Sequence, residues 1–416
     1  MRFRPSIYTL AVCLLVVSTP LLLPVPAWSD GGDVLWERTF HEGNDFATSV
    51  ASRGGRVFAG GFMQFESADD VNVVRAFSAR TGRVLWTRRA PKVADSESVL
   101  LAVAGHVLVA SLGPTIQAYH AHTGAVVWED DDPGGRVSGI AAGEHLVVAV
   151  GSRLAGGRLV RAYDPATGEL LWEDVSDAPE DRETAFAVVV VAGRVFVAGE
   201  RTDSQGRGTL RVRAYRARTG RLIWEDSGSG DGAGPGSTSV GFAVVSHAGV
   251  VAVAGERDLN PFVRAWAAGT GRPLWQHEVP QDPGLPTVGF FDAADVQGRR
   301  LIVGGSRGGF LVQALDLWTG ALHWEQRSRT ALGVALAVTH AARTVVATGL
   351  DDRNWLVQAY DARSGRLLWE DRIAGPGGAA IARDDEATHG RVFVVGEVNQ
   401  GDPDAADAVI RAYDLR

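Results

Sequence analysis

The sequence predicts an all-β protein, namely an eight-bladed β-propeller built from four-stranded antiparallel blades. Three observations support this prediction. A phrase that ends in tryptophan recurs at blade-like intervals, each copy of the phrase is typical of a β-hairpin, and the two ends of the chain each carry half of one further hairpin.

The N-terminal segment, residues 1–29, is expected to be a cleaved signal peptide. Two arginines precede an apolar stretch that ends near Val25, and the residues from Ala27 to Ser29 match a small-x-small cleavage motif. A retained membrane anchor is the alternative, but prolines interrupt the stretch and no basic cluster follows it. We therefore expect residues 30–416 to form the propeller in a periplasm or outside the cell, with no later membrane-spanning segment.

The recurring phrase reads Val-Arg-Ala-Tyr-Asp-x-x-Thr-Gly-x-Leu-Leu-Trp-Glu in its fullest form. Successive tryptophans lie 42 to 52 residues apart, which is enough for four short strands and their turns. We expect each indole to dock against a neighbouring blade and to bury on the order of 200 Å2. The eight docking residues are Trp36, Trp86, Trp128, Trp172, Trp224, Trp275, Trp324 and Trp369.

Each phrase predicts two strands joined by a tight turn. In the clearest copy, Leu159–Asp164 is rich in β-formers, Thr167-Gly168 supplies a turn in which glycine can adopt a positive φ, and Leu170–Glu173 returns. Arg161 would then lie opposite Glu173 and form a cross-strand ion pair. The same register places Arg213 opposite Glu225.

Two further apolar runs lie between successive hairpins, and we expect them to be the inner strands of each blade. Ala185–Val191 and Arg194–Ala198 are the clearest examples, since strands buried on both faces are continuously apolar. The chain ends complete the pattern, because Val34–Glu37 lacks a preceding partner strand and Val409–Asp414 lacks a following one. Pairing these two segments would close the ring and remove two exposed sheet edges.

Composition narrows the functional classes. The 416-residue chain has a formal net charge of −8, which argues against nucleic acid as a main partner. Cys13 is the only cysteine and lies in the signal segment, so the mature chain would contain neither a disulfide nor a cysteine-ligated metal. No nucleophile elbow, His-Glu-x-x-His motif or phosphate-binding glycine loop is present, and we assign no catalytic residue.

The phrase resembles the repeat of the pyrroloquinoline-quinone (PQQ) propeller superfamily, commonly Val-Tyr-Ala-Leu-Asp-Ala-x-Thr-Gly-Lys-x-Leu-Trp. Ile116–Trp128 and Val357–Trp369 are good matches, and the resemblance covers essentially the whole mature chain. It implies the fold more strongly than the function, because the superfamily includes quinoprotein dehydrogenases and non-enzymatic propellers such as the propeller lipoprotein of the outer-membrane β-barrel assembly machine.

The resemblance to quinoprotein dehydrogenases is incomplete. Such enzymes are expected to carry an adjacent Cys-Cys disulfide, a calcium site of Glu, Asn and Asp, a catalytic Asp and long insertions around the pocket. The disulfide cannot form here, and every blade is near minimal length. Trp355 is the only candidate for an aromatic pocket floor. We therefore expect neither PQQ nor Ca2+ as a cofactor.

The loops divide into two sets by charge. The Thr-Gly turns carry arginines, namely Arg80, Arg83, Arg218, Arg221, Arg272, Arg363 and Arg366. The loops expected at the opposite mouth of the ring are acidic, with Asp69, Asp70, Asp130, Asp131, Asp132, Glu180, Asp181, Asp203, Asp258, Asp402 and Asp404. These charges are either solvated loop ends or surfaces for a partner, a cationic ligand or a divalent metal.

Five acidic residues of the mouth are candidates for ligand or partner binding: Glu200, Glu256, Glu397, Asp351 and Asp352. The three glutamates each follow a glycine at the end of a predicted second strand, so their carboxylates could point together toward the ring, as a Ca2+ site would require.

We conclude from the sequence that the chain is an exported, non-catalytic and monomeric propeller that binds a protein or another envelope component. A quinoprotein-like oxidoreductase with a Ca2+-assisted site is the alternative hypothesis, and a carbohydrate or small ligand in the central channel is a third. An enzyme would need a polar pocket with converging ionisable groups, whereas a scaffold would expose a charged or apolar patch.

Overall fold

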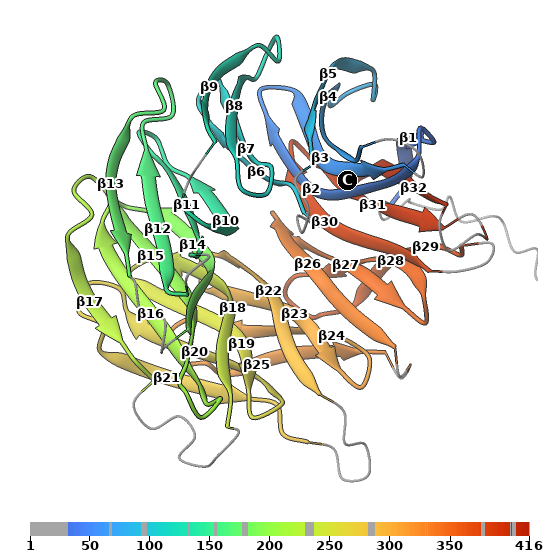
Figure 1. Cartoon of the computed structure of the whole chain (residues 1–416). Helices are drawn as coiled ribbons and strands as arrows, with labels where there is room; N and C mark the ends of the chain where they lie inside the picture. The colour runs from blue at the N-terminus through green and yellow to red at the C-terminus, as the bar shows by residue number, and fades with distance from the viewer. Residues whose placement is uncertain are drawn as a thin grey trace, which may run out of the picture.

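The computed structural model describes residues 32–65, 69–92, 98–131, 134–153, 156–176, 182–228, 237–281, 288–328, 330, 332–375, 379–399, 401 and 405–415. The predicted signal segment lies outside the described residues. Within them, 32 strands form eight four-stranded antiparallel sheets that are arranged as blades around a central axis (Figure 1). The predicted eight-bladed β-propeller is therefore confirmed. All the described elements are strands, and the described residues include no helix that could span a membrane.

Blades 1 to 7 follow one another along the chain, and blade 8 combines both chain ends. The innermost strands are β2 (Asn44–Arg53), β6 (Leu100–Ala104), β10 (Arg136–Ala142), β14 (Arg182–Val191), β18 (Ser239–His247), β22 (Gly289–Gln297), β26 (Gly333–Ala341) and β30 (Ala380–Thr388). The second strands are β3 (Arg56–Gln64), β7 (Val107–Ser111), β11 (Val147–Ser152), β15 (Arg194–Thr202), β19 (Val250–Arg257), β23 (Arg300–Arg307), β27 (Thr344–Asp351) and β31 (Arg391–Asn399).

The outer half of each blade is the predicted hairpin. The third strands are β4 (Val71–Ser78), β8 (Ile116–His120), β12 (Arg158–Tyr163), β16 (Gly208–Arg216), β20 (Asn260–Ala267), β24 (Phe310–Asp316), β28 (Asn354–Asp361) and β32 (Ala406–Asp414). The outer strands are β5 (Val84–Pro91), β9 (Val126–Asp130), β13 (Leu170–Val175), β17 (Leu222–Asp226), β21 (Pro273–Glu278), β25 (Leu322–Arg327), β29 (Leu367–Ile373) and β1 (Val34–Phe40).

The two chain ends close the ring as predicted. Strand β1 pairs antiparallel with β32, with Trp36 opposite Ala412 and Glu37 opposite Arg411. A backbone hydrogen bond of 2.7 Å from Gly32 N to Asp414 O extends the pairing. Blade 8 is thus complete only when both ends of the chain are in place.

Seven of the eight docking tryptophans donate an Nε1 hydrogen bond to a backbone carbonyl of the next blade. The acceptors, in the order of the tryptophans from Trp36 to Trp324, are Ala79, Ala121, Pro165, Ala217, Ala268, Leu317 and Ala362, at 2.7 to 3.2 Å. Within the described residues the Nε1 of Trp369 has no such acceptor. Burying the indole while satisfying its only polar atom lets each repeat lock onto its neighbour.

A glycine lies beneath each docking indole. At Gly82, φ is +64° and an added Cβ would lie 2.5 Å from the ring of Trp36, so no other residue fits there. Gly32 makes the same contact with Trp369, with φ at +90°. Gly32 precedes Trp36 by four residues, the spacing seen in every other copy, so the sequence contained this signal although the hairpin is split.

The innermost strands carry a second repeated feature, a bulge in the middle of the strand. The pairing of each with its neighbour shifts by one residue in every blade except blade 2. The extra residues are Thr48, Ser138, Phe186, Phe242, Asp292, Leu336 and Arg383, and all seven are half-buried. A bulge re-aims a side chain relative to a regular strand, so this position differs physically from its buried neighbours.

Candidate functional site

The three glutamates at the mouth do not form one cluster. Burial, and then the neighbouring carboxylate of Glu256, raise the pKa of Glu200, so these two residues interact across blades 4 and 5. Glu256 also accepts hydrogen bonds from Thr238 Oγ1 at 3.1 Å and from the backbone N of Leu259 at 3.3 Å. Glu397 is only 5% exposed and binds Arg383 with both carboxylate oxygens, at 2.5 and 2.6 Å. The expectation that all three carboxylates point together is therefore wrong for Glu397, because Arg383 neutralises it inside blade 8.

Asp351 is a structural anchor at the mouth. Its buried carboxylate accepts hydrogen bonds from Ser328 Oγ at 2.9 Å and from Arg372 Nη2 at 3.0 Å, and Thr330 donates a third. Asp352 is exposed, with φ at +51° in the β27–β28 turn, and its backbone N binds Leu332 O at 2.8 Å. Asp351 thus holds the loop before blade 7, and only Asp352 of this pair is available to a partner.

The Thr-Gly turns form an arginine-rich face, as the sequence predicts. The backbone N of Ala79 donates a hydrogen bond of 3.0 Å to Gly55 O in the turn between β2 and β3. The Thr-Gly turn of this blade and the turn between its first and second strands therefore lie on the same side of the ring. All seven predicted turn arginines are exposed. At the opposite mouth, five of the predicted acidic residues, Asp132, Glu180, Asp181, Asp402 and Asp404, lie outside the described residues.

The predicted cross-strand pairs are confirmed, with Arg161 Nε 3.0 Å from Glu173 Oε2 and Arg213 Nη2 3.1 Å from Glu225 Oε1. The sequence did not reveal that three arginines at this repeat position, Arg161, Arg264 and Arg411, also pair with an Asp two residues after the docking tryptophan of the preceding blade. Arg411, for example, binds Asp371 at 2.7 Å, and the hydroxyl of Tyr413 donates to the same carboxylate. The arginine therefore links two blades rather than supporting one.

The residues of the link vary together within the chain. Where the preceding blade supplies the Asp, the next blade has Arg, as at Asp130 and Arg161, Asp174 and Arg213, Asp226 and Arg264, and Asp371 and Arg411. Where it does not, the next blade has Gln at positions 117, 313 and 358. Blade 1 differs, because Arg75 is paired instead with Glu42, at 3.0 Å.

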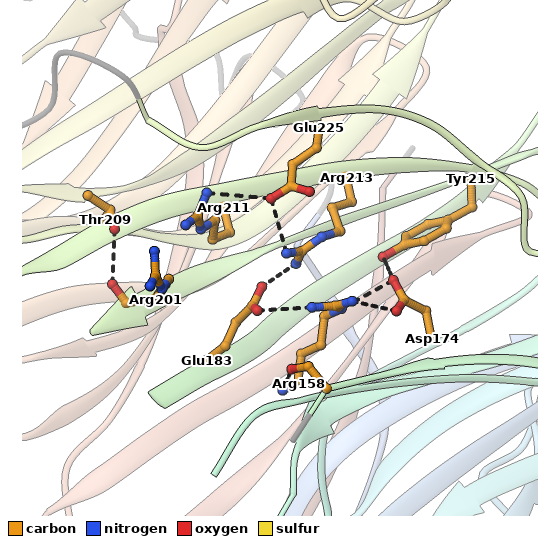
Figure 2. A network of polar contacts seen from close by, with 10 residues as sticks. Arg158, Asp174, Glu183, Arg201, Thr209, Arg211, Arg213, Tyr215 and Glu225 are labelled. Carbon is orange, nitrogen blue, oxygen red and sulfur yellow. Dashed lines mark hydrogen bonds and ion pairs between the residues drawn. The ribbon is translucent and has the colours of Figure 1, made fainter. Parts of the chain in front are cut away.

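The most extensive link joins blades 3 and 4 (Figure 2). Glu183 lies between two arginines, bound by Arg158 at 3.1 Å and in close contact with Arg213. Arg158 also pairs with Asp174, at 2.5 and 3.1 Å. Burial opposes the ionisation of Asp174, but hydrogen bonds from Arg158 and Tyr215 hold its pKa below the usual range. The ionisable groups in this network are thus used to hold blades together.

The central channel contains a cavity of about 360 Å3 that all eight innermost strands line. Its described lining is apolar or small except for Ser49, Asp384 and Asp385. Burial raises the pKa of Asp384 to about 6, although the backbone N of Val50 and of Asp385 donate to it at 2.8 and 2.9 Å. Both Oδ atoms of Asp385 are shielded from solvent. Of the described residues that line the cavity, none is cationic.

These residues do not fit the quinone cofactor implied by the resemblance. PQQ carries three carboxylates and would need cationic partners, whereas the ionisable groups at the cavity are carboxylates. Trp355, the candidate pocket floor, is fully buried between blades 7 and 8 instead of facing the channel. In the described part of the chain, no group of three or more His, Cys, Asp or Glu side chains is placed to hold a metal ion.

Comparison with solved structures shows the same fold in both branches of the resemblance. BamB from Moraxella catarrhalis superposes with a TM-score of 0.59 at 14% identity, over 92% of this chain and 99% of BamB. Quinohemoprotein alcohol dehydrogenase from Comamonas testosteroni gives a TM-score of 0.66 at 13% identity, over 93% of this chain and 77% of the enzyme. The computationally designed protein Ika8 gives 0.62 at 17% identity, over 92% of this chain and 100% of the design.

No curated protein sequence matches the chain at a significant level. A family model does match, twice in succession, over residues 25–210 and 207–402. These matches span nearly all of the propeller, and the repeat, the ring closure and the structural neighbours agree with them. The chain belongs to the PQQ-like β-propeller family whose model is described as outer membrane protein assembly factor BamB.

Proposed function

We propose that the chain is an exported, non-catalytic scaffold of the cell envelope that binds a protein partner through the exposed faces of the ring. The observation that carries this proposal is the distribution of charge. The channel presents carboxylates where a tricarboxylate quinone would need cations, while the exposed arginines gather on the turn face.

The family description supports a protein partner, because it names an assembly factor for outer membrane proteins. The buried ion pairs support a rigid scaffold, because groups such as Arg158, Glu183 and Arg213 have their charges satisfied between blades. A catalytic group would instead have to remain available to a substrate. A closed ring of this kind presents a fixed surface at little cost in conformational entropy on binding.

Site-specific photo-crosslinking tests the proposal. A photoreactive amino acid replaces Arg221 in the β16–β17 turn or, as a matched position, Gln205 in the β15–β16 turn at the mouth of the same blade; both are exposed. We expect a discrete crosslinked protein band in the native envelope from one face and not from the other. The absence of any protein adduct at both positions would overturn the scaffold proposal.

A cofactor titration tests the alternative enzyme hypothesis. The purified propeller is mixed with PQQ and Ca2+, and both the quinone absorbance and the melting temperature are followed. We expect neither to change. A rise of several degrees in Tm together with a bound-quinone spectrum would instead identify a quinoprotein, and a screen of alcohols and sugars as substrates would follow.

A further inference from the structure

The bulges give the innermost strands of seven blades one extra, half-buried side chain near the channel. The residues that precede the bulge residues, such as Ala185, Gly241 and Phe291, are buried, whereas the bulge residues are half-exposed. Two of the bulge residues, Phe242 of blade 5 and Leu336 of blade 7, line the channel cavity, because a bulge re-aims its side chain relative to a regular strand. The bulges therefore contribute to what the channel offers to a ligand.

Consecutive blades contribute an aromatic arc that reaches the channel cavity at Phe242. Phe186 and Phe242 are the bulge residues of blades 4 and 5, and their ring centroids lie 5.7 Å apart at an interplanar angle of 60°. Phe290 on β22 continues the arc, with its centroid 6.3 Å from that of Phe242 at 77°. All three rings are half-exposed, and Phe242 lines the 360 Å3 cavity.

The next bulge residue along the ring is Asp292, two residues after Phe290. Within the described residues it has no ion pair and no hydrogen-bonding side chain, and burial alone raises its pKa to about 6. Ala293, the next residue in the chain, and Leu336, the bulge residue of blade 7, both line the cavity. The bulge carboxylate of blade 6 thus lies between two blades whose bulge residues, Phe242 and Leu336, line the cavity, and it has no counter-ion from the described chain.

Three other polar groups near this level already have partners. Thr48, the bulge residue of blade 1, donates to Val99 O at 3.0 Å, and Arg383, that of blade 8, is neutralised by Glu397. Asp295 on the same strand as Asp292 accepts a hydrogen bond of 2.6 Å from the backbone N of His340. Asp292 differs from these three residues because its carboxylate has no partner within the described chain and can pair with a bound cation.

We propose that the channel binds an organic ammonium ion, with Asp292 as the counter-ion and the rings of Phe242 and its neighbours Phe186 and Phe290 against the cation. Aromatic faces attract quaternary and primary ammonium groups through the ring quadrupole, and a partly desolvated carboxylate strengthens that attraction. The apolar walls fit the carbon atoms that surround the charge. A single available carboxylate suits a monovalent organic cation better than a divalent metal, which needs several oxygen ligands.

Isothermal titration of the purified chain with choline tests this inference. The neutral isostere 3,3-dimethylbutan-1-ol is the matched control ligand, and we expect it to bind at least about tenfold more weakly because it lacks the charge. Nα-acetyl-lysine amide is titrated in parallel. Tighter binding of choline supports a free quaternary ammonium ligand, and tighter binding of the lysine derivative supports a basic side chain of a partner.

Variants locate the site. Asp292→Asn should weaken choline binding about tenfold, and Phe242→Leu, which stays apolar but loses the ring, about threefold. Asp384→Asn is the control, since it removes a carboxylate of the same cavity that is already bound to backbone N–H groups; it should change binding less than twofold. Asp292→Asn removes a charge without a partner, so we expect the variant to fold, and its thermal melt verifies this.

Two results would overturn the inference. One is that neither choline nor the lysine derivative binds the wild-type chain. The other is that Asp384→Asn weakens binding as much as Asp292→Asn does, which would mean that the cation responds only to the general negative potential of the channel. Neither result bears on the scaffold proposal, which concerns the outer faces of the ring.

Discussion

The docking tryptophan and the glycine beneath it form the smallest unit that holds this ring together. Trp86, for example, packs on Gly124 of the next blade, where φ is +70° and an added Cβ would lie 2.6 Å from the indole. The glycine serves two needs at once, because it permits the left-handed turn and leaves room for the ring. The tryptophan and the glycine are therefore constrained together, in every blade.

Two glycines of blade 2 allow the effect of the positive φ to be measured separately from the effect of the indole contact. Gly124→Ala should lower the free energy of unfolding by about 2–4 kcal/mol, from backbone strain plus displacement of the indole. Gly105→Ala should cost only about 1 kcal/mol, since Gly105 has φ at +59° but no atom within 4 Å of an added Cβ. Urea denaturation measures both values. Equal losses would show that the indole contact adds nothing to the backbone requirement.

Buried carboxylates at the channel predict a pH dependence of stability. Burial raises the pKa of Glu386 to about 7, and the nearby carboxylates of Asp384 and Asp295 add to this, while a hydrogen bond from Ser52 opposes it. Because the folded state holds the proton more tightly than the unfolded state, this residue makes the protein less stable as pH rises from about 4.5 to about 7.

Glu386→Gln tests that dependence, since glutamine keeps the shape and can still bind Ser52. At pH 8 the variant should be more stable than the wild type by about 2 kcal/mol, and near pH 4.5 the two should be equal. Urea denaturation at both pH values gives the comparison. A difference that does not change with pH would mean that Glu386 does not titrate in this range.

At the scale of the element, the hairpin of one blade is joined to the next by an arginine and an aspartate. The sequence predicts the pairing within the hairpin, because Arg161 and Glu173 follow from strand register alone. It does not predict that Arg161 also lies 3.6 Å from Asp130 of the preceding blade, since that contact depends on how two sheets pack. The joint variation of Asp with Arg along the repeats was the available signal.

The buried and exposed members of these links should differ in their contribution to stability. Glu183→Gln leaves Arg158 and Arg213 short of a partner in a site where the glutamate side chain is 10% exposed, so we expect a loss of about 3 kcal/mol. Glu173→Gln affects a side chain that is 40% exposed and should cost less than about 0.5 kcal/mol. Similar losses for the two variants in urea denaturation would contradict the inter-blade role of Glu183.

At the scale of the whole molecule, ring closure makes blade 8 depend on both ends of the chain. Deleting the chain through Phe40 removes β1, the contact between Glu37 and Arg411 and the docking of Trp36 on blade 1. The exposed edge of β32 would then be open to pairing with other molecules. Deleting only residues 1–31 leaves these contacts in place and is the matched control.

We expect the longer deletion to lower Tm by at least about 5 °C relative to the control, because it removes a strand and an interlocked tryptophan that together contribute several kcal/mol. It should also form oligomers in size-exclusion chromatography. A monomeric deletion variant with an unchanged melt would show that the split hairpin is not needed to close the ring.

The propeller, the number of blades, the closing hairpin and the cross-strand pairs could all be predicted from the sequence. These features depend on periodicity and on contacts between residues that are close in the chain or at equivalent positions of the repeats. The same pattern occurs in all eight repeats, so it can be recognised in the sequence. The contact of Gly32 with a docking tryptophan and the joint change of Asp and Arg between blades could also be predicted, by aligning the repeats with one another.

Which charges are available to a ligand or partner depends on the packing of the blades. This packing separated Glu397 from Glu200 and Glu256 by pairing it with Arg383, made Asp351 an anchor, and left Asp292 half-buried at a bulge with no partner in the described chain. Whether a carboxylate is neutralised, buried or exposed depends on neighbours supplied by other strands and other blades, and a one-residue bulge is enough to re-aim a side chain. The spacing of residues along the chain predicts neither the neighbours from other blades nor the position of a bulge.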